Sequence, residues 1–430
     1  MSDYLSNITP DSFSGIVFAL EGVSRSVVLI NGPSGCKFYH SATSDNQTIK
    51  QFEFDPLNYP EKWYFGQPRV PCTYLDNSDY VYGSREKLAD ALEFLRDNVA
   101  FDIMCIVNSP GAALIGDDLR GIAEDILGDK PLVIIETPGF SSDICAGYET
   151  AAMELLKQIQ INESPKKRPK TVNIIGLSIF HKYYAGDIAE LQRLLAFCGI
   201  EINCVLCADC GLESLKNIGS AALNIAIHPE YGLQTAEYLR VRFGTPYYIC
   251  DGPPIGFSAT ERLICDVGAA LDADVSAFTV ESERARARAY SHISRVNSLT
   301  GLPKGVEFSV EGTYSELYAY TSFFVQYFGM ILECASVLNE NCGCFRDAFV
   351  GLLDDLGLSS AMQRDIMEAG SEMVFGSGST IAGLRLRGRD FVGIETCLPT
   401  LGYIDVVPKT HLGIHGALTL VEQVLNALIF

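Results

Sequence analysis

The stretch S-V-V-L-I-N-G-P-S-G-C, residues 26–36, indicates the fold class and contains the first candidate site. Its first half is a short apolar run, which is typical of a strand buried in a parallel sheet. Its second half is a glycine-rich turn that ends in Cys36. Ligands of open parallel sheets bind beyond the carboxyl ends of the strands, so this turn is where we expect a functional group.

The same plan of strand, turn and helix recurs along the chain. Apolar runs at residues 101–108, 131–137, 171–177 and 306–310 predict further buried strands, and helical patterns separate them. This alternation indicates an α/β protein built from three Rossmann-like, doubly wound parallel sheets. We expect three domains, over residues 1–165, 166–303 and 304–430.

Composition and charge narrow the functional classes. A chain of 430 residues with 48% hydrophobic residues can bury a large core, and its net charge of −21 repels nucleic-acid backbones. The one dense basic run, K-K-R-P-K at residues 166–170, is interpreted as a solvated linker rather than a nucleic-acid site. No apolar run reaches the roughly 18 residues of a membrane span, and the N-terminus lacks a secretory signal. We therefore expect a cytoplasmic protein that binds neither nucleic acid nor membrane.

Cysteines dominate the candidate site residues. Fourteen of them in a cytoplasmic chain are not expected to form disulfides, so they divide among buried thiols, metal ligands and reactive groups. Gly32 and Gly35 let the first turn bend tightly and let a bulky ligand approach Cys36. Cys72 lies in another loop, after prolines and before a helix. For both cysteines the local sequence is consistent with two roles, an inert buried thiol or a ligand of a metal or cluster.

A second group of cysteines lies farther along the chain. Cys204, Cys207 and Cys210 have the C-x2-C-x2-C spacing that also occurs in iron–sulfur proteins. The first two fall within or at the end of a predicted strand, where their side chains need not converge. A ligand role therefore stays open for Cys207 and Cys210. Cys145 and Cys250 also lie at strand ends or in the loops beyond them.

Three other polar features have competing explanations. His228 ends a strand at a turn, and it is a candidate for metal binding, for proton transfer or for a structural hydrogen bond. Asp117 and Asp118 precede a helix, where capping explains them more simply than acid–base catalysis. Cys342 and Cys344 lie in a polar loop and are interpreted as structural thiols.

Several catalytic motifs are missing from the sequence. It has no nucleotide P-loop, no H-E-x-x-H, no G-x-S-x-G and no dinucleotide fingerprint after a strand. The residues alone thus lead to a three-unit α/β protein with cysteines on strand-end loops, and to a cluster-binding oxidoreductase as one possible function.

Several segments, in this order, resemble the component 1 family of nitrogenase and nitrogenase-like reductases. They cover almost the entire chain, and the resemblance implies three domains around a central cavity. The segments are N-G-P-S-G-C, S-D-Y-V-Y-G-S-R-E-K-L, L-I-G-D-D-L, E-T-P-G-F, C-A-G-Y, A-L-N-I-A-I-H-P-E-Y-G, F-G-T-P-Y-Y, P-I-G-F-S-A-T, S-E-R-A-R and L-G-I-H-G-A-L-T-L-V-E-Q-V-L-N-A-L.

The resemblance implies that Cys36 and Cys72 are ligands of an iron–sulfur cluster at a subunit interface. The family commonly has a third cysteine just before the I-G-D-D segment, where this chain has Ser109. Two cysteines per chain supply four thiolates across a two-fold dimer, enough for one [4Fe–4S] cluster but too few for an eight-iron cluster. We therefore expect a homodimer, with a non-identical partner chain as the alternative.

The resemblance also implies a second site. His228 falls where the nitrogenase catalytic subunit has a cysteine that holds its iron–molybdenum cofactor, and no clear counterpart of the cofactor histidine is present. His411 aligns poorly as a ligand, and His415 is interpreted as lining a helix start. Near the active site we expect a cavity that holds a tetrapyrrole, a small sulfur compound or a second metal cluster, with Tyr148 and His228 as catalytic residues. Its expected lining is Tyr148, Cys145, Cys207, Cys210, His228 and Cys250.

Two functions are consistent with this resemblance. In the first, the chain receives low-potential electrons from a separate ATP-hydrolysing iron–sulfur reductase and passes them to the cavity. In the second, it is a scaffold on which a metal cofactor is assembled before transfer. A metal-free α/β binding protein that kept the fold is the third interpretation.

Overall fold

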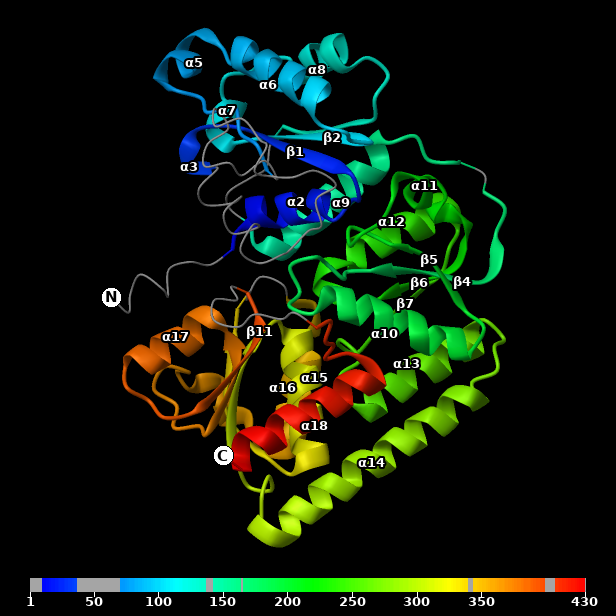
Figure 1. Cartoon of the computed structure of the whole chain (residues 1–430), viewed down its shortest axis with the longest axis vertical. Helices are drawn as coiled ribbons and strands as arrows, with labels where there is room; N and C mark the ends of the chain where they lie inside the picture. The colour runs from blue at the N-terminus through cyan, green and yellow to red at the C-terminus, as the bar shows by residue number, and fades with distance from the viewer. Residues whose placement is uncertain are drawn as a thin grey trace.

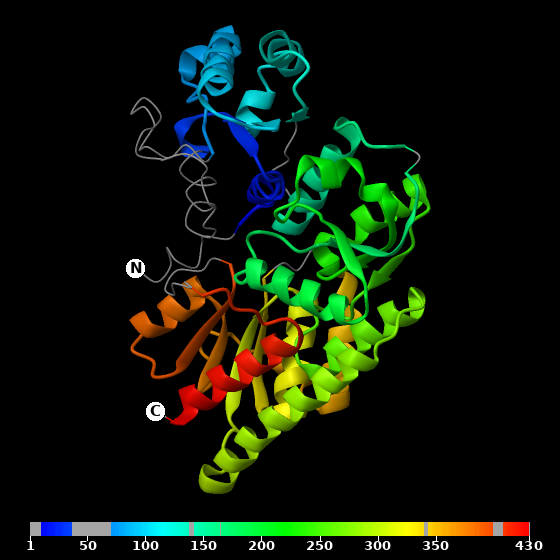
Figure 2. The same cartoon turned by 45° about the vertical axis from the view of Figure 1, so that its right-hand side comes forward.

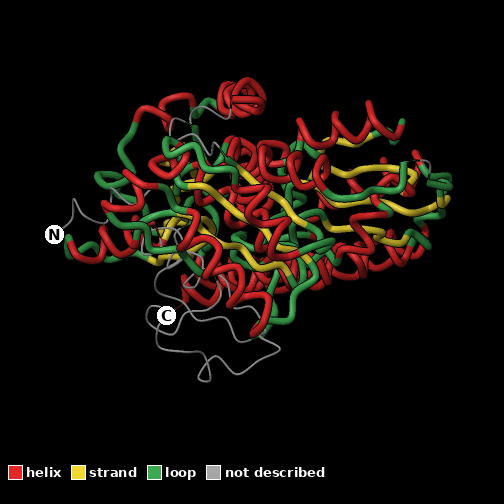
Figure 3. Tube along the Cα trace, turned by 90° about the horizontal axis from the view of Figure 1, so that it is seen from above, coloured by secondary structure: helices red, strands yellow, loops and turns green. Residues whose placement is uncertain are grey.

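The structure is a computed structural model that describes residues 10–36, 70–136, 142–163, 165–338, 343–398 and 407–429. Three separate parallel sheets, each flanked by helices, account for its described strands (Figures 1 and 2). Seen from above, the strands lie inside and most of the helices outside (Figure 3). The predicted class, an α/β protein with three parallel sheets, is confirmed.

The apolar run at residues 26–30 forms the first strand of the first sheet. It has the order β1-β2-β3, and its strands are β1 (Ser26–Asn31), β2 (Ile103–Asn108) and β3 (Leu132–Ile135). Val27 and Leu29 pack toward α6 and α8, whereas Val28 and Ile30 pack toward α2 and α9, as the two-residue period of a strand requires. The helices are α2 (Ser12–Glu21), α3 (Ser34–Cys36), α5 (Asn77–Tyr82), α6 (Arg85–Asn98), α7 (Pro110–Ala113), α8 (Leu119–Leu127) and α9 (Ile144–Gln158).

The second sheet has the order β5-β4-β6-β7. β5 is added on one side of β4 and β6 on the other, so the strand order reverses between β4 and β6. In a doubly wound sheet the crevice for a ligand lies at such a switch point, beyond the carboxyl ends of the two strands. The strands are β4 (Arg168–Ile175), β5 (Glu201–Val205), β6 (Ala221–Ala226) and β7 (Tyr247–Ile249). The helices are α10 (Tyr184–Phe197), α11 (Leu212–Lys216), η4 (Ile218–Ser220), η5 (Pro229–Tyr231), α12 (Leu233–Phe243), α13 (Phe257–Ala270) and α14 (Ser276–Thr300).

The third sheet has the order β11-β10-β8-β9, with its switch point between β8 and β10. Helix α15 follows β8 directly and runs into a π-helical turn, η6. The strands are β8 (Glu307–Gly312), β9 (Ile331–Val337), β10 (Met373–Ser377) and β11 (Val392–Cys397). The helices are α15 (Tyr314–Phe323), η6 (Phe324–Phe328), η7 (Gly343–Phe345), α16 (Arg346–Leu356), η8 (Ser359–Gln363), α17 (Gly378–Leu386) and α18 (Gly413–Ile429).

The three sheets follow the order of the predicted domains. β4 begins at Arg168 and β8 at Glu307, close to the predicted borders, although the borders themselves stay a prediction. β4 therefore starts inside the basic run that was interpreted as a linker, and Arg168 pairs with Glu201 of β5. The last helix, α18, packs back on α10, α13 and α14 of the second unit (Figure 1). None of the described helices combines the length and the apolar character that crossing a bilayer requires.

Candidate functional site

The turn after β1 places Cys36 at the carboxyl edge of the first sheet. Cys36 ends the one-turn helix α3 and is partly exposed. Gly32 is required for close approach, since a Cβ there would lie 2.8 Å from both Cβ and Oγ of Ser109. A Cβ at Gly35 would meet no atom of the described residues within 4 Å.

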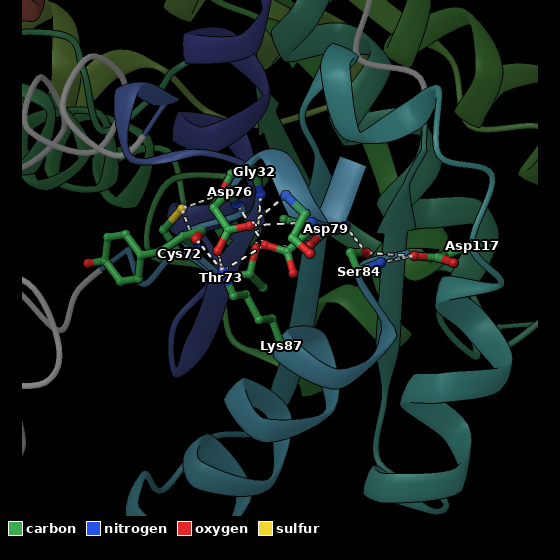
Figure 4. Close-up of polar contacts among 11 residues, drawn as sticks. Gly32, Cys72, Thr73, Asp76, Asp79, Ser84, Lys87 and Asp117 are labelled. Atoms are coloured by element: carbon green, nitrogen blue, oxygen red, sulfur yellow. Dashed lines mark hydrogen bonds and ion pairs between the residues drawn. The ribbon is translucent and has the colours of Figure 1, made fainter. Parts of the chain in front are cut away.

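Cys72 lies beside β1 on the opposite edge from β2. The Ile30 amide donates to Pro71 O at 2.9 Å and the Thr73 amide donates to Ile30 O at 3.0 Å, which makes this loop a short parallel extension of the sheet. The Cys72 side chain is buried, and its Sγ lies 3.1 Å from the Gly32 carbonyl oxygen. The Tyr74 amide points at the same sulfur from 3.4 Å (Figure 4).

Cys36, Cys72, Ser109 and Tyr80 form one cluster. Burial and the charge of Asp11 raise the pKa of the Cys36 thiol, and a hydrogen bond with Ser109 opposes this shift. The pKa of the Tyr80 phenol is raised mainly by burial, and both Cys36 and Cys72 add to that shift because they lie close to it. Of the predicted cofactor-binding residues of the first unit, Cys36, Cys72 and Ser109 are therefore brought together, whereas Cys145 is buried on α9.

A buried polar network fixes the backbone that carries the two cysteines. Asn31 Nδ2 donates to Asn108 Oδ1 at 2.9 Å, which ties β1 to β2. Thr73 Oγ1 donates to Asn31 Oδ1 at 2.9 Å and accepts from the Gly32 amide at 3.0 Å. The turn bearing Cys36 and the loop bearing Cys72 are thus held by the same side chains (Figure 4).

The V-Y-G-S-R-E-K segment braces the Cys72 loop from the other side. Lys87 Nζ donates to the Tyr74 carbonyl at 3.1 Å and pairs with Asp76 at 2.9 Å and Asp79 at 2.6 Å. Ser84 donates to Asp117 Oδ2 from its amide at 2.5 Å and from its hydroxyl at 2.8 Å (Figure 4).

Asp118 accepts from the Gly121 amide at 3.0 Å and caps α8. The capping explanation is confirmed for Asp118, and Asp117 instead joins α6 to this region.

These residues fit an iron–sulfur cluster by donor chemistry. Two thiols lie near Tyr80 at one edge of the sheet, and the backbone amide of Tyr74 is a hydrogen-bond donor of the kind that tunes cluster sulfurs. The third polar side chain, Ser109, offers a hydroxyl in place of a thiol and uses it to cap α7 at the Ala112 amide. Cys36 is partly exposed, so groups outside the chain can approach its sulfur.

A second group of donors lies between the second and third sheets. His181 follows β4 and His228 follows β6, so both come from the switch point of the second sheet. Glu316 comes from the first turn of α15, directly after β8. All three side chains are buried, and one possible ligand atom from each lies within 4.8 Å of the others. The two imidazole rings stack at 3.9 Å between centroids.

The protonation states of this group follow from its burial. Burial lowers the pKa of His228 to about 3 and holds that of His181 well below its usual value, so both rings are neutral at pH 7. Burial raises the pKa of Glu316 to about 7. Nε2 of His181 and Nδ1 of His228 are buried without a hydrogen-bond partner.

Two small cavities flank these three residues. One of about 40 Å³ is lined by His181, Glu316 and Cys397, and one of about 30 Å³ is lined by His181, His228 and Glu316. As bounded by the described residues, each has room for about one water molecule or a similarly small ligand. His411 lines the second cavity, with its Nδ1 bonded to Tyr320 and its Nε2 to Gln423.

The other predicted cavity residues do not meet at His228. Tyr148 is buried and donates its hydroxyl hydrogen toward Leu177 O at 2.9 Å and Leu206 O at 3.3 Å. Cys145 is buried on α9, and Cys250 lines a different cavity of about 350 Å³ between α13, α14 and α15. The catalytic assignment of Tyr148 and His228 stays a prediction.

The C-x2-C-x2-C segment forms a thiol pair rather than a triad. Cys204 donates to Cys210, and together with backbone amides this bond lowers the pKa of Cys210, whereas the pKa of Cys207 is raised well above its usual value by burial. Cys207 itself adopts φ +58° in the turn. Among the described residues, His181, His228 and Glu316 are the one group of three potential metal donors this close together. Cys342 lies outside the described residues, and Cys344 is exposed.

Comparison with known families identifies the group to which this architecture corresponds. The model of the family described as nitrogenase component 1 type oxidoreductase matches residues 12–429. The chain belongs to this family. The resemblance predicted from the sequence is therefore confirmed, and so is the oxidoreductase class.

Individual members of the nitrogenase component 1 family differ considerably from this chain. It is 25% identical over 319 residues to a subunit of the light-independent protochlorophyllide reductase of Heliobacterium modesticaldum, covering 72% of this chain and 60% of that protein. The same subunit of a Nostoc species is 28% identical over 216 residues, covering 47% of this chain and 42% of that protein. The matched stretches thus span about half the length of these relatives.

Solved structures agree with the fold. A structure titled nitrogenase Cp1 at pH 6.5 superposes with a TM-score of 0.76 at 17% identity, covering 98% of this chain and 92% of that one. A second, titled nitrogenase Cp1 at pH 5, gives a TM-score of 0.69 at 18% identity, covering 97% and 88%.

Two residues of the second group were not predicted from the sequence. His181 lies six residues beyond the end of β4, so the strand-end rule did not single it out. Glu316 is the glutamate of a T-Y-S-E capping box after β8, a pattern that is readable in the sequence but normally signifies only a helix start.

Proposed function

We propose that this chain is a component 1 subunit of an ATP-coupled reductase that accepts low-potential electrons at Cys36 and Cys72. The observation that carries the proposal is the meeting of these two thiols at the carboxyl edge of the first sheet, in a chain of this family. A [4Fe–4S] cluster held there would supply one-electron transfer.

The chain's own residues prepare this position in three ways. The Asn31, Thr73 and Asn108 network fixes the two backbones that carry the thiols. Burial of Cys72 keeps water from one side of the site. The amide of Tyr74 donates to the Cys72 sulfur and helps to fix its position.

Thiol counting supports a dimer as part of the proposal. One chain brings two thiolates, so a four-thiolate set needs a second copy or a related chain. The surface beside Tyr80 supports a subunit contact, because Val81, Tyr82 and Leu114 expose 72%, 87% and 88% of their areas there. Exposed apolar side chains gathered beside a site are typical of an interaction surface. In a homodimer both subunits contribute this surface to the contact, whereas in a heteromer only this chain does.

The proposed electron donor is a separate ATP-hydrolysing iron–sulfur reductase. This chain carries no P-loop, so ATP hydrolysis belongs to a partner. The destination of the electrons is the region of His181, His228 and Glu316, whose described cavities suit a small ligand. A tetrapyrrole substrate, as the name of the protochlorophyllide reductase relatives suggests, requires further space formed with another subunit. We propose a cytoplasmic location for this assembly.

A cofactor-assembly scaffold is the second candidate function. The unpartnered ring nitrogens of His181 and His228 favour it, since they offer donors to a metal cofactor in transit. The two functions differ in turnover. A scaffold transfers its metal cofactor to an acceptor protein, whereas a reductase keeps its metal through repeated electron transfer.

The proposed function is tested by iron content in cysteine variants. Cys36→Ser and Cys72→Ser should each remove most of the iron after anaerobic purification, because a neutral hydroxyl replaces a thiolate poorly on iron. Cys265→Ser is the matched control, since Cys265 is exposed on α13, in the second unit. Iron content that is equal in all three variants would refute the assignment of Cys36 and Cys72.

A further inference from the structure

We propose that His181, His228 and Glu316 bind a single divalent transition-metal ion. This site is separate from the cysteines at the first sheet and uses no thiolate. It also differs from the cysteine-lined metal cluster expected from the sequence, because the cavity cysteines are not gathered beside His228.

The geometry of the three side chains carries the proposal. His228 Nδ1 lies 3.8 Å from Glu316 Oε1, and one ligand atom from each of the three residues lies within 4.8 Å of the others. Donors that bind one ion at about 2.1 Å stand roughly 3 to 3.5 Å apart. The two rings are stacked at an angle of 12°, so binding one ion requires one ring to rotate out of the stack as well as an approach of the three donors by about 1 Å.

Two of the donor atoms have no hydrogen-bond partner within the part of the chain that the structure describes. They are Nε2 of His181 and Nδ1 of His228, and a fully buried ring nitrogen without a bond is unusual in a well-packed interior. Both rings are uncharged, and a neutral imidazole is the form that ligates metals. A bound cation would accept the lone pair of His228 Nδ1 directly, and that of His181 Nε2 once the ring hydrogen has moved to Nδ1.

Glu316 supplies the anionic donor from a fixed position. Its Oε2 accepts from the Thr313 amide at 2.9 Å and from the Thr313 hydroxyl at 3.2 Å. These bonds hold the carboxylate in place and leave Oε1 facing His228. The amide and hydroxyl of Thr313 would thus orient the ligating carboxylate from outside the coordination sphere.

One existing hydrogen bond changes when an ion binds. The Ser178 amide donates to His181 Nδ1 at 3.0 Å, so the neutral ring carries its hydrogen on Nε2. Ligation through Nε2 moves that hydrogen to Nδ1 and breaks the bond from Ser178. Three metal–ligand bonds replace one hydrogen bond.

The type of ion and the open positions follow from the donor set. Two imidazoles and one carboxylate favour Fe²⁺, Co²⁺, Ni²⁺ or Zn²⁺ over Mg²⁺ and Ca²⁺, which prefer oxygen. The two cavities of about 40 and 30 Å³ border these residues and leave space for one or two small ligands on the ion. Sites with three protein ligands and an open position are typical of metal ions that bind substrate.

The test is equilibrium dialysis of the full-length chain against Co²⁺ without oxygen, with excess Mg²⁺ present to occupy surface carboxylates. Cobalt is counted by mass spectrometry, and circular dichroism verifies that each variant is folded. We expect about one Co²⁺ per chain, without a sulfur-to-cobalt charge-transfer band. His228→Gln and Glu316→Gln should each weaken binding at least about tenfold.

His411→Gln is the matched control, because His411 lines the same cavity but has both ring nitrogens bonded within the chain. It should leave cobalt binding unchanged, and so should Cys36→Ser. Absence of tight Co²⁺ binding in the wild type would overturn the proposal. So would equal binding in the wild type, His228→Gln and Glu316→Gln, or a charge-transfer band that shows thiolate ligation. None of these results bears on iron at Cys36 and Cys72, so the two proposals fail separately.

Discussion

Ser109 and Cys36 face each other across the turn after β1. The strand-end rule and the glycines drew attention to Cys36, and the family resemblance added Cys72 and the position of Ser109. Local sequence alone could not pair them, because the contact joins residues 36, 72 and 109 through a network that forms only in the folded sheet. His181 and Glu316 were missed for the same reason, since each comes from a different sheet.

The Ser109 hydroxyl should tune the Cys36 thiol. Its hydrogen bond lowers the pKa of Cys36, so Ser109→Ala should raise that pKa and slow alkylation of Cys36 at pH 8. The measurement is peptide-level mass spectrometry of iron-free protein treated with iodoacetamide. Ser78→Ala, on the exposed side of α5, should leave the rate unchanged. An equal rate in Ser109→Ala and the wild type would contradict the contact.

Helices α2 and α9 cross at two glycines, which brings their backbones together beneath the first sheet (Figure 2). A Cβ at Gly15 would lie 2.1 Å from Ile144 O, and one at Gly147 would lie 1.9 Å from Ser12 O. This contact could not be predicted from the sequence, because the segments lie more than 120 residues apart and a helix glycine alone signals only low helix propensity.

Gly147→Ala should destabilise the protein by about 2–3 kcal/mol, since its methyl group meets a backbone oxygen that cannot move aside. Gly351→Ala in α16 is the control, because it is exposed and a Cβ there meets nothing within 4 Å. That substitution should stabilise the protein by about 0.5–1 kcal/mol. Calorimetric Tm values measure both. A fall in Tm that is equal for both variants would contradict the close crossing.

Across the whole molecule, three parallel sheets pack with their helices, and several carboxylates are buried among them. The three-sheet plan was predictable from alternating apolar runs and helical patterns. The small size of the cavities beside His228 was not, since it depends on how Glu316, Thr396 and His411 pack between two sheets. Local sequence patterns also could not predict the large cavity lined by Cys250 or the packing of α18 on the second unit.

Stability should fall between pH 6.5 and pH 8. Burial raises the pKa of Glu149 and of Asp187 to about 7, so their protonated forms stabilise the folded chain. That stabilisation is complete below their unfolded pKa values and is lost as pH rises through 7. Buried histidines with lowered pKa values act in the opposite direction, but only below pH 6.5.

Glu149→Gln isolates one of these groups. Glutamine keeps an oxygen that can accept from the amides of Gln234 and Thr235 but does not titrate. Between pH 6.5 and 8 the variant should lose about 1 kcal/mol less stability than the wild type. Urea midpoints at both pH values give this difference. Parallel pH profiles for the two proteins would show that Glu149 does not titrate in this range.

One four-iron cluster, shared by Cys36 and Cys72 of two chains, is the core of the proposed function. Its presence is measured as iron and acid-labile sulfide per chain after anaerobic purification, with the oligomer mass determined on the same sample. We predict about two irons and two sulfides per chain in a dimer. An iron-free protein after reconstitution, or a full four-iron cluster on an isolated single chain, would contradict the shared cluster.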